Sequence, residues 1–190
     1  MKILLTALFS IALLSFTVMV DKPTIDKSEA QKAYIFLNQV RANVTAYAKE
    51  LELPANIKIS THALVWNDTL AKVAETKALD MATRNYFSHV DPDGVGMNFY
   101  INKAGYKLNE YQLKTKRQNS YESISAGYDT GEEVIKSLII DTWDPVNLGH
   151  RKHLLGMEGW AGTTDIGIGF ARGTDANKFP SYVSIIIAKH

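Results

Sequence analysis

Three residues far apart in the sequence carry side chains that could form a functional site: His89, Glu122 and His150. A neutral imidazole carries protons near pH 7 and binds transition metals, and a carboxylate can orient an imidazole or share either role. His89 follows a helical pattern, Glu122 lies in an extended stretch, and His150 follows another predicted helix. We expect the fold to bring these three side chains together at one water-accessible hollow.

Each of the three residues also has a purely structural explanation. His89 could cap carbonyls at a helix end, and His150 could be a surface residue beside Arg151. Glu122 lies in a stretch that looks semi-buried, where a carboxylate needs a partner. A cluster that only ties loops together by hydrogen bonds therefore stays open as an alternative.

Helical patterns precede and follow these residues. The first predicted helix begins at Asp26, whose side chain would form a capping box with Glu29, and Pro54 stops it. A second helix begins at Asn67 or Asp68 and runs out near Asn85, and three alanines in it would let a neighbour approach closely. Its predicted buried face consists of Leu70, Val73, Ala74, Lys77, Ala78 and Met81.

The later part of the chain predicts further helices and two strands. A short helix over residues 98–104 ends at Gly105, and a longer one starts at a capping box at Thr130 and carries Trp143 on its apolar side. Residues 165–171 and 182–188 read as strands joined by a hairpin loop, and residues 106–120 as a surface loop with room for one strand. This order predicts an α+β domain with helices on both faces of a small antiparallel sheet.

Composition limits the function classes. The 190 residues are 46% apolar and 22% charged, which is typical of a globular protein, and the net charge of +1 gives no reason to expect a nucleic-acid partner. The chain has no cysteine, so disulfides, thiolate metal sites and cysteine nucleophiles are excluded. Neither Gly-x-Ser-x-Gly nor His-Glu-x-x-His occurs in the sequence, which leaves a serine-hydrolase elbow and the common zinc-protease helix without support.

The first 20 residues predict export. Lys2 precedes a nearly continuous apolar run over residues 3–20, which has the shape of a signal peptide, and an uncleaved signal anchor is the competing interpretation. Residues 21–30 then form a polar leader and residues 31–190 the folded domain. We expect a secreted, periplasmic or cell-envelope protein that contacts a membrane only through residues 1–20, if these are not removed.

Residues 87–94 read Phe-Ser-His-x-Asp-Pro-Asp-Gly, the longest of a set of motifs along the chain. The shorter ones are Leu64-Val65-Trp66-Asn67, Gly105-Tyr106, Glu122-Ser123-Ile124, Gly149-His150-Arg151 and Gly167-x-Gly169. In kind and order these motifs resemble those of the bacterial branch of the CAP superfamily (cysteine-rich secretory, antigen 5 and pathogenesis-related proteins, also called SCP-like). The resemblance runs from about Ala33 to the end of the chain.

The resemblance implies an α-β-α sandwich with a solvent-filled cleft lined by two histidines and two glutamates. His89, Glu122 and His150 correspond to three of these four, and the histidines would bind zinc or another divalent metal. The fourth acidic position is Val146 here, and Asp144 or Asp141 could take its place. The resemblance also implies a small-molecule or lipid ligand, or an extracellular or envelope partner.

Two functions remain open from the sequence. The first is a non-enzymatic module whose cleft binds a metal or a small ligand. The second is a hydrolase in which Glu122 and a histidine act as general base and acid on a water molecule, with or without a metal.

Overall fold

The computed structural model describes residues 21–189. The signal peptide or anchor predicted over residues 1–20 lies outside this part of the chain. Within it, no helix is long and apolar enough to cross a membrane.

A small sheet forms the middle layer of the fold, as predicted. The strands β4 (Asp165–Arg172) and β5 (Ser181–Ala188) form the expected antiparallel hairpin, with Asp165 opposite Ala188 and Arg172 opposite Ser181. The strand β3 (Glu122–Ala126) pairs antiparallel with β5 at one edge. On the other side of the sheet, β1 (Thr24–Ile25) pairs antiparallel with β4, and β2 (Val65–Trp66) adds a short parallel pairing to β4. Part of the leader predicted over residues 21–30 therefore belongs to the sheet.

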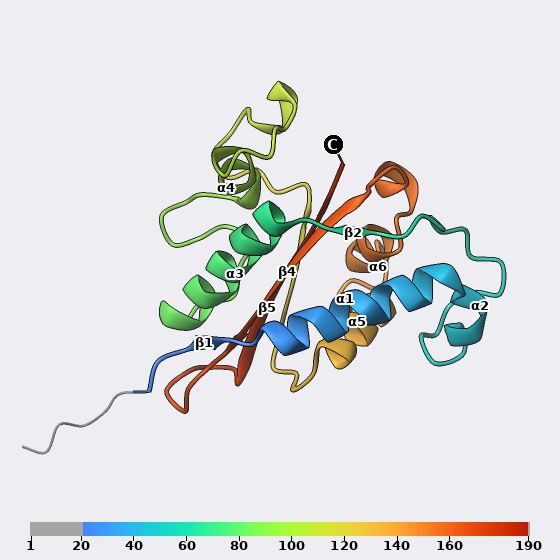
Figure 1. The fold of residues 1–190 in the computed structure, drawn as a ribbon, viewed down its shortest axis with the longest axis horizontal. Coiled ribbons are helices and arrows are strands. Elements are labelled where there is room, and N and C mark those ends of the chain that lie inside the picture. Colours follow the sequence, from blue (N-terminus) through green and yellow to red (C-terminus); the bar gives the residue numbers. More distant parts are fainter. Residues whose placement is uncertain (1–20, 190) are drawn as a thin grey trace, which may run out of the picture.

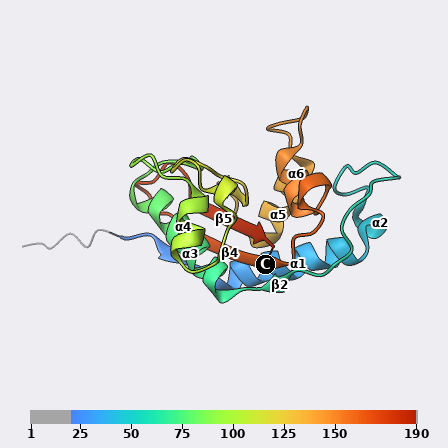
Figure 2. The same ribbon diagram turned by 90° about the horizontal axis from the view of Figure 1, so that it is seen from above.

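Helices cover both faces of this sheet (Figures 1 and 2). One face packs against α1 (Lys27–Ala42), α5 (Gly131–Ile140) and α6 (Gly149–Leu154). The other face packs against α3 (Asp68–Thr83) and α4 (Met97–Lys103). The short helix α2 (Val44–Tyr47) follows α1, and 3₁₀ turns lie at Glu110–Gln112 and Glu158–Trp160. The predicted α-β-α arrangement is confirmed.

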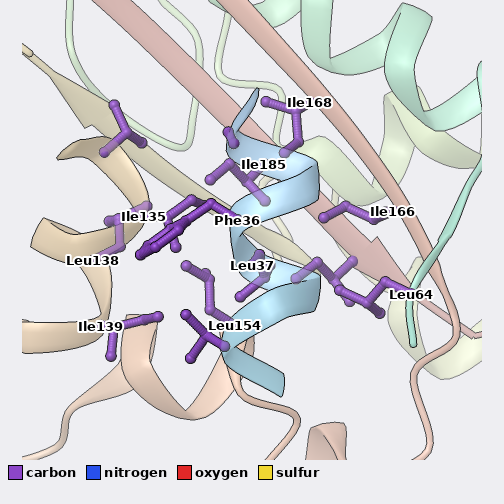
Figure 3. Close-up of a cluster of buried hydrophobic side chains, with 14 of the residues drawn as sticks. Phe36, Leu37, Leu64, Ile135, Leu138, Ile139, Leu154, Ile166, Ile168 and Ile185 are labelled. Atoms are coloured by element: carbon purple, nitrogen blue, oxygen red, sulfur yellow. The ribbon is translucent and has the colours of Figure 1, made fainter. Parts of the chain in front are cut away.

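Strand alternation divides the core into two halves. Alternate residues of β4 and β5 point to the α1 side, where the side chains of Figure 3 interlock between α1, α5, α6 and the sheet. The intervening residues of β4 include Gly167 and Gly169, which face α3. A Cβ at Gly169 would lie 2.3 Å from the backbone of Ala74, so these glycines permit the close contact of β4 with α3.

Two helices differ from their predictions. The first predicted helix stops at Ala42, because the side chain of Asn43 accepts a hydrogen bond from the Ala46 amide and starts α2 instead. The helix predicted to carry Trp143 stops at Ile140, because Asp141 adopts a left-handed conformation with φ of 56°. Trp143 is therefore 83% exposed rather than packed against the core.

Candidate functional site

A hollow of about 300 Å³ opens where the edge of the sheet meets two loops and α6. Glu122 stands at the start of the edge strand β3, His89 lies in the loop after α3, and His150 lies in the first turn of α6. All four residues predicted for the ligand cleft line this hollow, including Asp144; its other lining residues are Asn119, Ser120, Ser123, Gly149, His153 and Trp160.

His89 and Glu122 form the first of two imidazole–carboxylate pairs. His89 Nδ1 lies 3.0 Å from Glu122 Oε2, and the other carboxylate oxygen accepts a 2.7 Å hydrogen bond from the Ser184 hydroxyl on β5. The Glu122 side chain is fully buried, whereas that of His89 is 39% exposed. The imidazole can therefore meet a ligand from solution, while the carboxylate fixes its orientation from behind.

His150 and Asp141 form the second pair. His150 Nδ1 lies 2.8 Å from Asp141 Oδ1, while Asp141 Oδ2 accepts the backbone amide of His150 at 2.9 Å. The Asp141 side chain is fully buried and that of His150 is 25% exposed. Asp141 rather than Asp144 is thus the acidic partner of the second histidine, and Asp144 instead accepts hydrogen bonds from Asn147 at the rim.

The two helix ends beside His150 stabilise each other. The Asp141 carboxylate follows α5 and accepts amides at the start of α6, where the helix dipole favours a negative charge. The buried guanidinium of Arg151, on α6, donates to the carbonyl oxygens of Ile139 and Ile140 at the end of α5. This exchange fixes the angle between the helices and with it the position of His150.

A third hydrogen-bonded histidine, His153, lies in the wall of the hollow, and no sequence motif pointed to it. His153 Nδ1 lies 2.7 Å from the Ser123 hydroxyl, and its Nε2 lies 3.3 Å from the carbonyl oxygen of Ile187. Burial lowers the pKa of His153 to about 3, so the ring stays neutral. A serine beside a histidine suggests a catalytic nucleophile and its base. Here Ser123 is only 1% exposed and His153 resists protonation, so we interpret this pair as structural.

The hollow offers two imidazoles as donors that a divalent ion could use. Because Nδ1 of each histidine bonds to a carboxylate, Nε2 is the nitrogen left to bind a ligand, and such a carboxylate also makes the imidazole a better donor. Within residues 21–189, no group of three or more His, Cys, Asp or Glu side chains is arranged to hold a metal.

A larger hollow of about 750 Å³ lies between α3 and α4. None of the predicted site residues lines it. We therefore place the candidate functional site at the smaller hollow, because the two imidazole–carboxylate pairs lie there.

Comparison with known proteins agrees with the fold. The family model for the cysteine-rich secretory protein (CAP) family matches residues 36–187. The chain belongs to the CAP family. The predicted family membership is thus confirmed, although this member has no cysteine.

Two bacterial proteins illustrate the relationship. The chain is 28% identical over 159 residues to the uncharacterized protein YkwD of Bacillus subtilis (strain 168), a match that covers 79% of this chain and 54% of YkwD. The crystal structure of an extracellular SCP-domain protein from Bacillus anthracis superposes with a TM-score of 0.55 at 21% identity. This match covers 86% of this chain and 41% of that one. The chain thus spans about half the length of these relatives.

Proposed function

We propose that this protein is an exported CAP-family binding module whose hollow holds a divalent metal ion or a small polar ligand through His89 and His150. The observation that carries the proposal is the paired arrangement: two partly exposed imidazoles line one hollow, and a fully buried carboxylate orients each of them. Zinc accepts imidazole nitrogen readily, and a bound ion would act as a Lewis acid toward a ligand in the hollow.

Two further observations support parts of the proposal. The hollow's volume of about 300 Å³ is at the lower end of ligand pockets, which favours a metal ion or a small polar molecule over a lipid chain. Export is supported by the apolar run over residues 3–20, and the similar protein from Bacillus anthracis is described as extracellular.

The test is a zinc titration followed by calorimetry on the wild type and on the double variant His89→Ala/His150→Ala. His62→Ala is the matched control, because His62 is exposed and lies outside the hollow. We expect the wild type and the control to bind one zinc ion and the double variant to bind none. Equal binding by all three proteins would remove the metal from the proposal.

A general acid–base hydrolase is the alternative, and the two imidazole–carboxylate pairs facing one hollow are the observation in its favour. The buried carboxylate of Glu122 cannot meet a water molecule, so His89 would be the base and Glu122 its orienting partner. Turnover in a panel of esters, peptides and glycans that disappears in His89→Gln would support this function. If the folded wild type turns over none of these substrates, that result would count against the hydrolase function.

A further inference from the structure

Lys77 is a charged residue in the middle of the buried face of α3. It is only 5% exposed, and its helix neighbours Ala74 and Ala78 are fully buried. An ammonium group is stable in such a place only when it is hydrogen-bonded and charge-compensated. The partners of Lys77 therefore indicate what the residue does.

All three hydrogen-bond partners of Lys77 lie in the four-residue segment that carries His89. Its Nζ donates to the carbonyl oxygen of Ser88 at 2.7 Å, to that of His89 at 3.3 Å and to the hydroxyl of Tyr86 at 3.1 Å. Tyr86 is itself fixed by a 2.6 Å hydrogen bond to Asp80, one turn further along α3. The ammonium thus ties to a rigid helix the backbone from which the His89 imidazole extends.

The charge of Lys77 also acts on the carboxylate that orients His89. Burial lowers the pKa of Lys77, and attraction to Glu122 is the strongest effect that opposes this shift, ahead of Asp80 and Asp91. The hydrogen-bond partners of the Glu122 carboxylate are the Ser184 hydroxyl and the His89 imidazole. Lys77 therefore supplies positive charge that attracts this fully buried carboxylate.

We propose that Lys77 is the positioning residue of the His89–Glu122 pair: its ammonium fixes the backbone of His89 and compensates the charge of Glu122. The His150–Asp141 pair does not depend on it, because that pair is held by the ends of α5 and α6. This role of Lys77 rests on the proposed function only for its effect on metal binding. The hydrogen bonds from Lys77 to the His89 segment are present without a metal ion.

The test begins with the metal-free protein at constant pH. Ring ¹⁵N shifts measured by NMR report which imidazole nitrogen carries the proton, and His89→Gln assigns the His89 signals. In the wild type we expect His89 and His150 to carry the proton on Nδ1, where each faces its carboxylate. In Lys77→Met, His89 should lose this fixed tautomer while His150 keeps it. Lys72→Met, on the exposed side of the same helix, should change neither signal.

The second readout is the affinity for cobalt(II), followed by its absorption. Removing a residue that orients a metal ligand typically weakens binding 10- to 100-fold, so we expect Lys77→Met to bind cobalt at least tenfold more weakly than Lys72→Met. If the wild type binds no cobalt, the proposed metal binding is contradicted. The positioning role of Lys77 is decided separately, by the NMR result. An unchanged His89 tautomer in folded Lys77→Met overturns the inference.

Should Lys77→Met fail to fold, Tyr86→Phe takes its place, because it removes one of the three acceptors of the ammonium and leaves the charge intact. We then expect a smaller change in the His89 tautomer, again with His150 unaffected. Identical His89 signals in Tyr86→Phe and the wild type would count against Lys77 as the positioning residue.

Discussion

At the scale of single residues, the site depends on buried groups behind two exposed imidazoles. Asp141 shows this most clearly, because its one carboxylate orients His150 and also accepts amides at the start of α6. It also ends α5 in a left-handed conformation, which asparagine and aspartate tolerate better than other residues with a side chain. One residue thus determines the end of one helix, the start of the next and the tautomer of a histidine.

Substitution of Asp141 separates these roles. Both Asp141→Asn and Asp141→Ala lose the carboxylate. Asparagine is suited to positive φ, whereas alanine adds a left-handed backbone penalty of about 1–2 kcal/mol. We expect urea unfolding to show Asp141→Ala to be less stable than Asp141→Asn by about that amount. Both variants should bind zinc about 10- to 100-fold more weakly than the wild type. Equal stability of the two variants would show that the conformation of Asp141 carries no strain.

His153 predicts how stability depends on pH. Its pKa is about 3 in the folded protein and would be about 6.5 in the unfolded chain, so the unfolded chain binds more protons between these values. The free energy of unfolding should therefore fall as the pH drops below about 6.5, and His153 alone should account for about 2 kcal/mol between pH 7 and pH 5. Urea unfolding at both pH values measures this loss.

The matched comparison for His153 is His153→Gln, which should show a weaker pH dependence than the wild type. His62→Gln, at an exposed position, should keep the pH dependence of the wild type. A His153→Gln variant that loses as much stability as the wild type on acidification would contradict the assignment.

At the scale of helices and strands, the sequence predicted elements well where apolar periodicity is strong. The buried face of α3 and the β4–β5 hairpin lie as expected, because the alanines of α3 and the glycines of β4 fit each other. The predictions that the first helix runs to Pro54 and that a later helix carries Trp143 were wrong. A side-chain cap at Asn43 and a left-handed residue at Asp141 end helices that periodicity alone would continue. The spacing of apolar residues does not reveal where a side-chain hydrogen bond or a left-handed residue will end a helix.

The contact between β4 and α3 gives a test at this scale. Gly169→Ala would place a methyl group 2.3 Å from the backbone of Ala74, so we expect a loss of about 1–3 kcal/mol from overpacking. Gly159→Ala is the control, because a Cβ there meets nothing within 4 Å. Thermal unfolding of the two variants compares them directly, and equal midpoints would mean that the helix can move away from the sheet without loss.

At the scale of the whole molecule, the sheet edge, the loop after α3 and the start of α6 meet at one hollow. The residue types and the family motifs predicted His89, Glu122 and His150, and all three line the hollow together with Asp144. Asp141 was one of two candidates for the fourth acidic residue, and the structure pairs it with His150. The roles of His153 and Lys77 could not be predicted, because they depend on the folded positions of Ser123 and of the loop after α3. A lysine on the predicted buried face of a helix was the one available signal, since an apolar face rarely contains an ammonium.

We propose that His89 and His150 hold one ion together, and a crystal structure of the protein grown with zinc would show whether they do. We predict an anomalous zinc signal in the hollow, bonded to Nε2 of both histidines at about 2.0–2.1 Å. A zinc ion bound by only one of the two imidazoles, or found only elsewhere on the protein, would contradict the account.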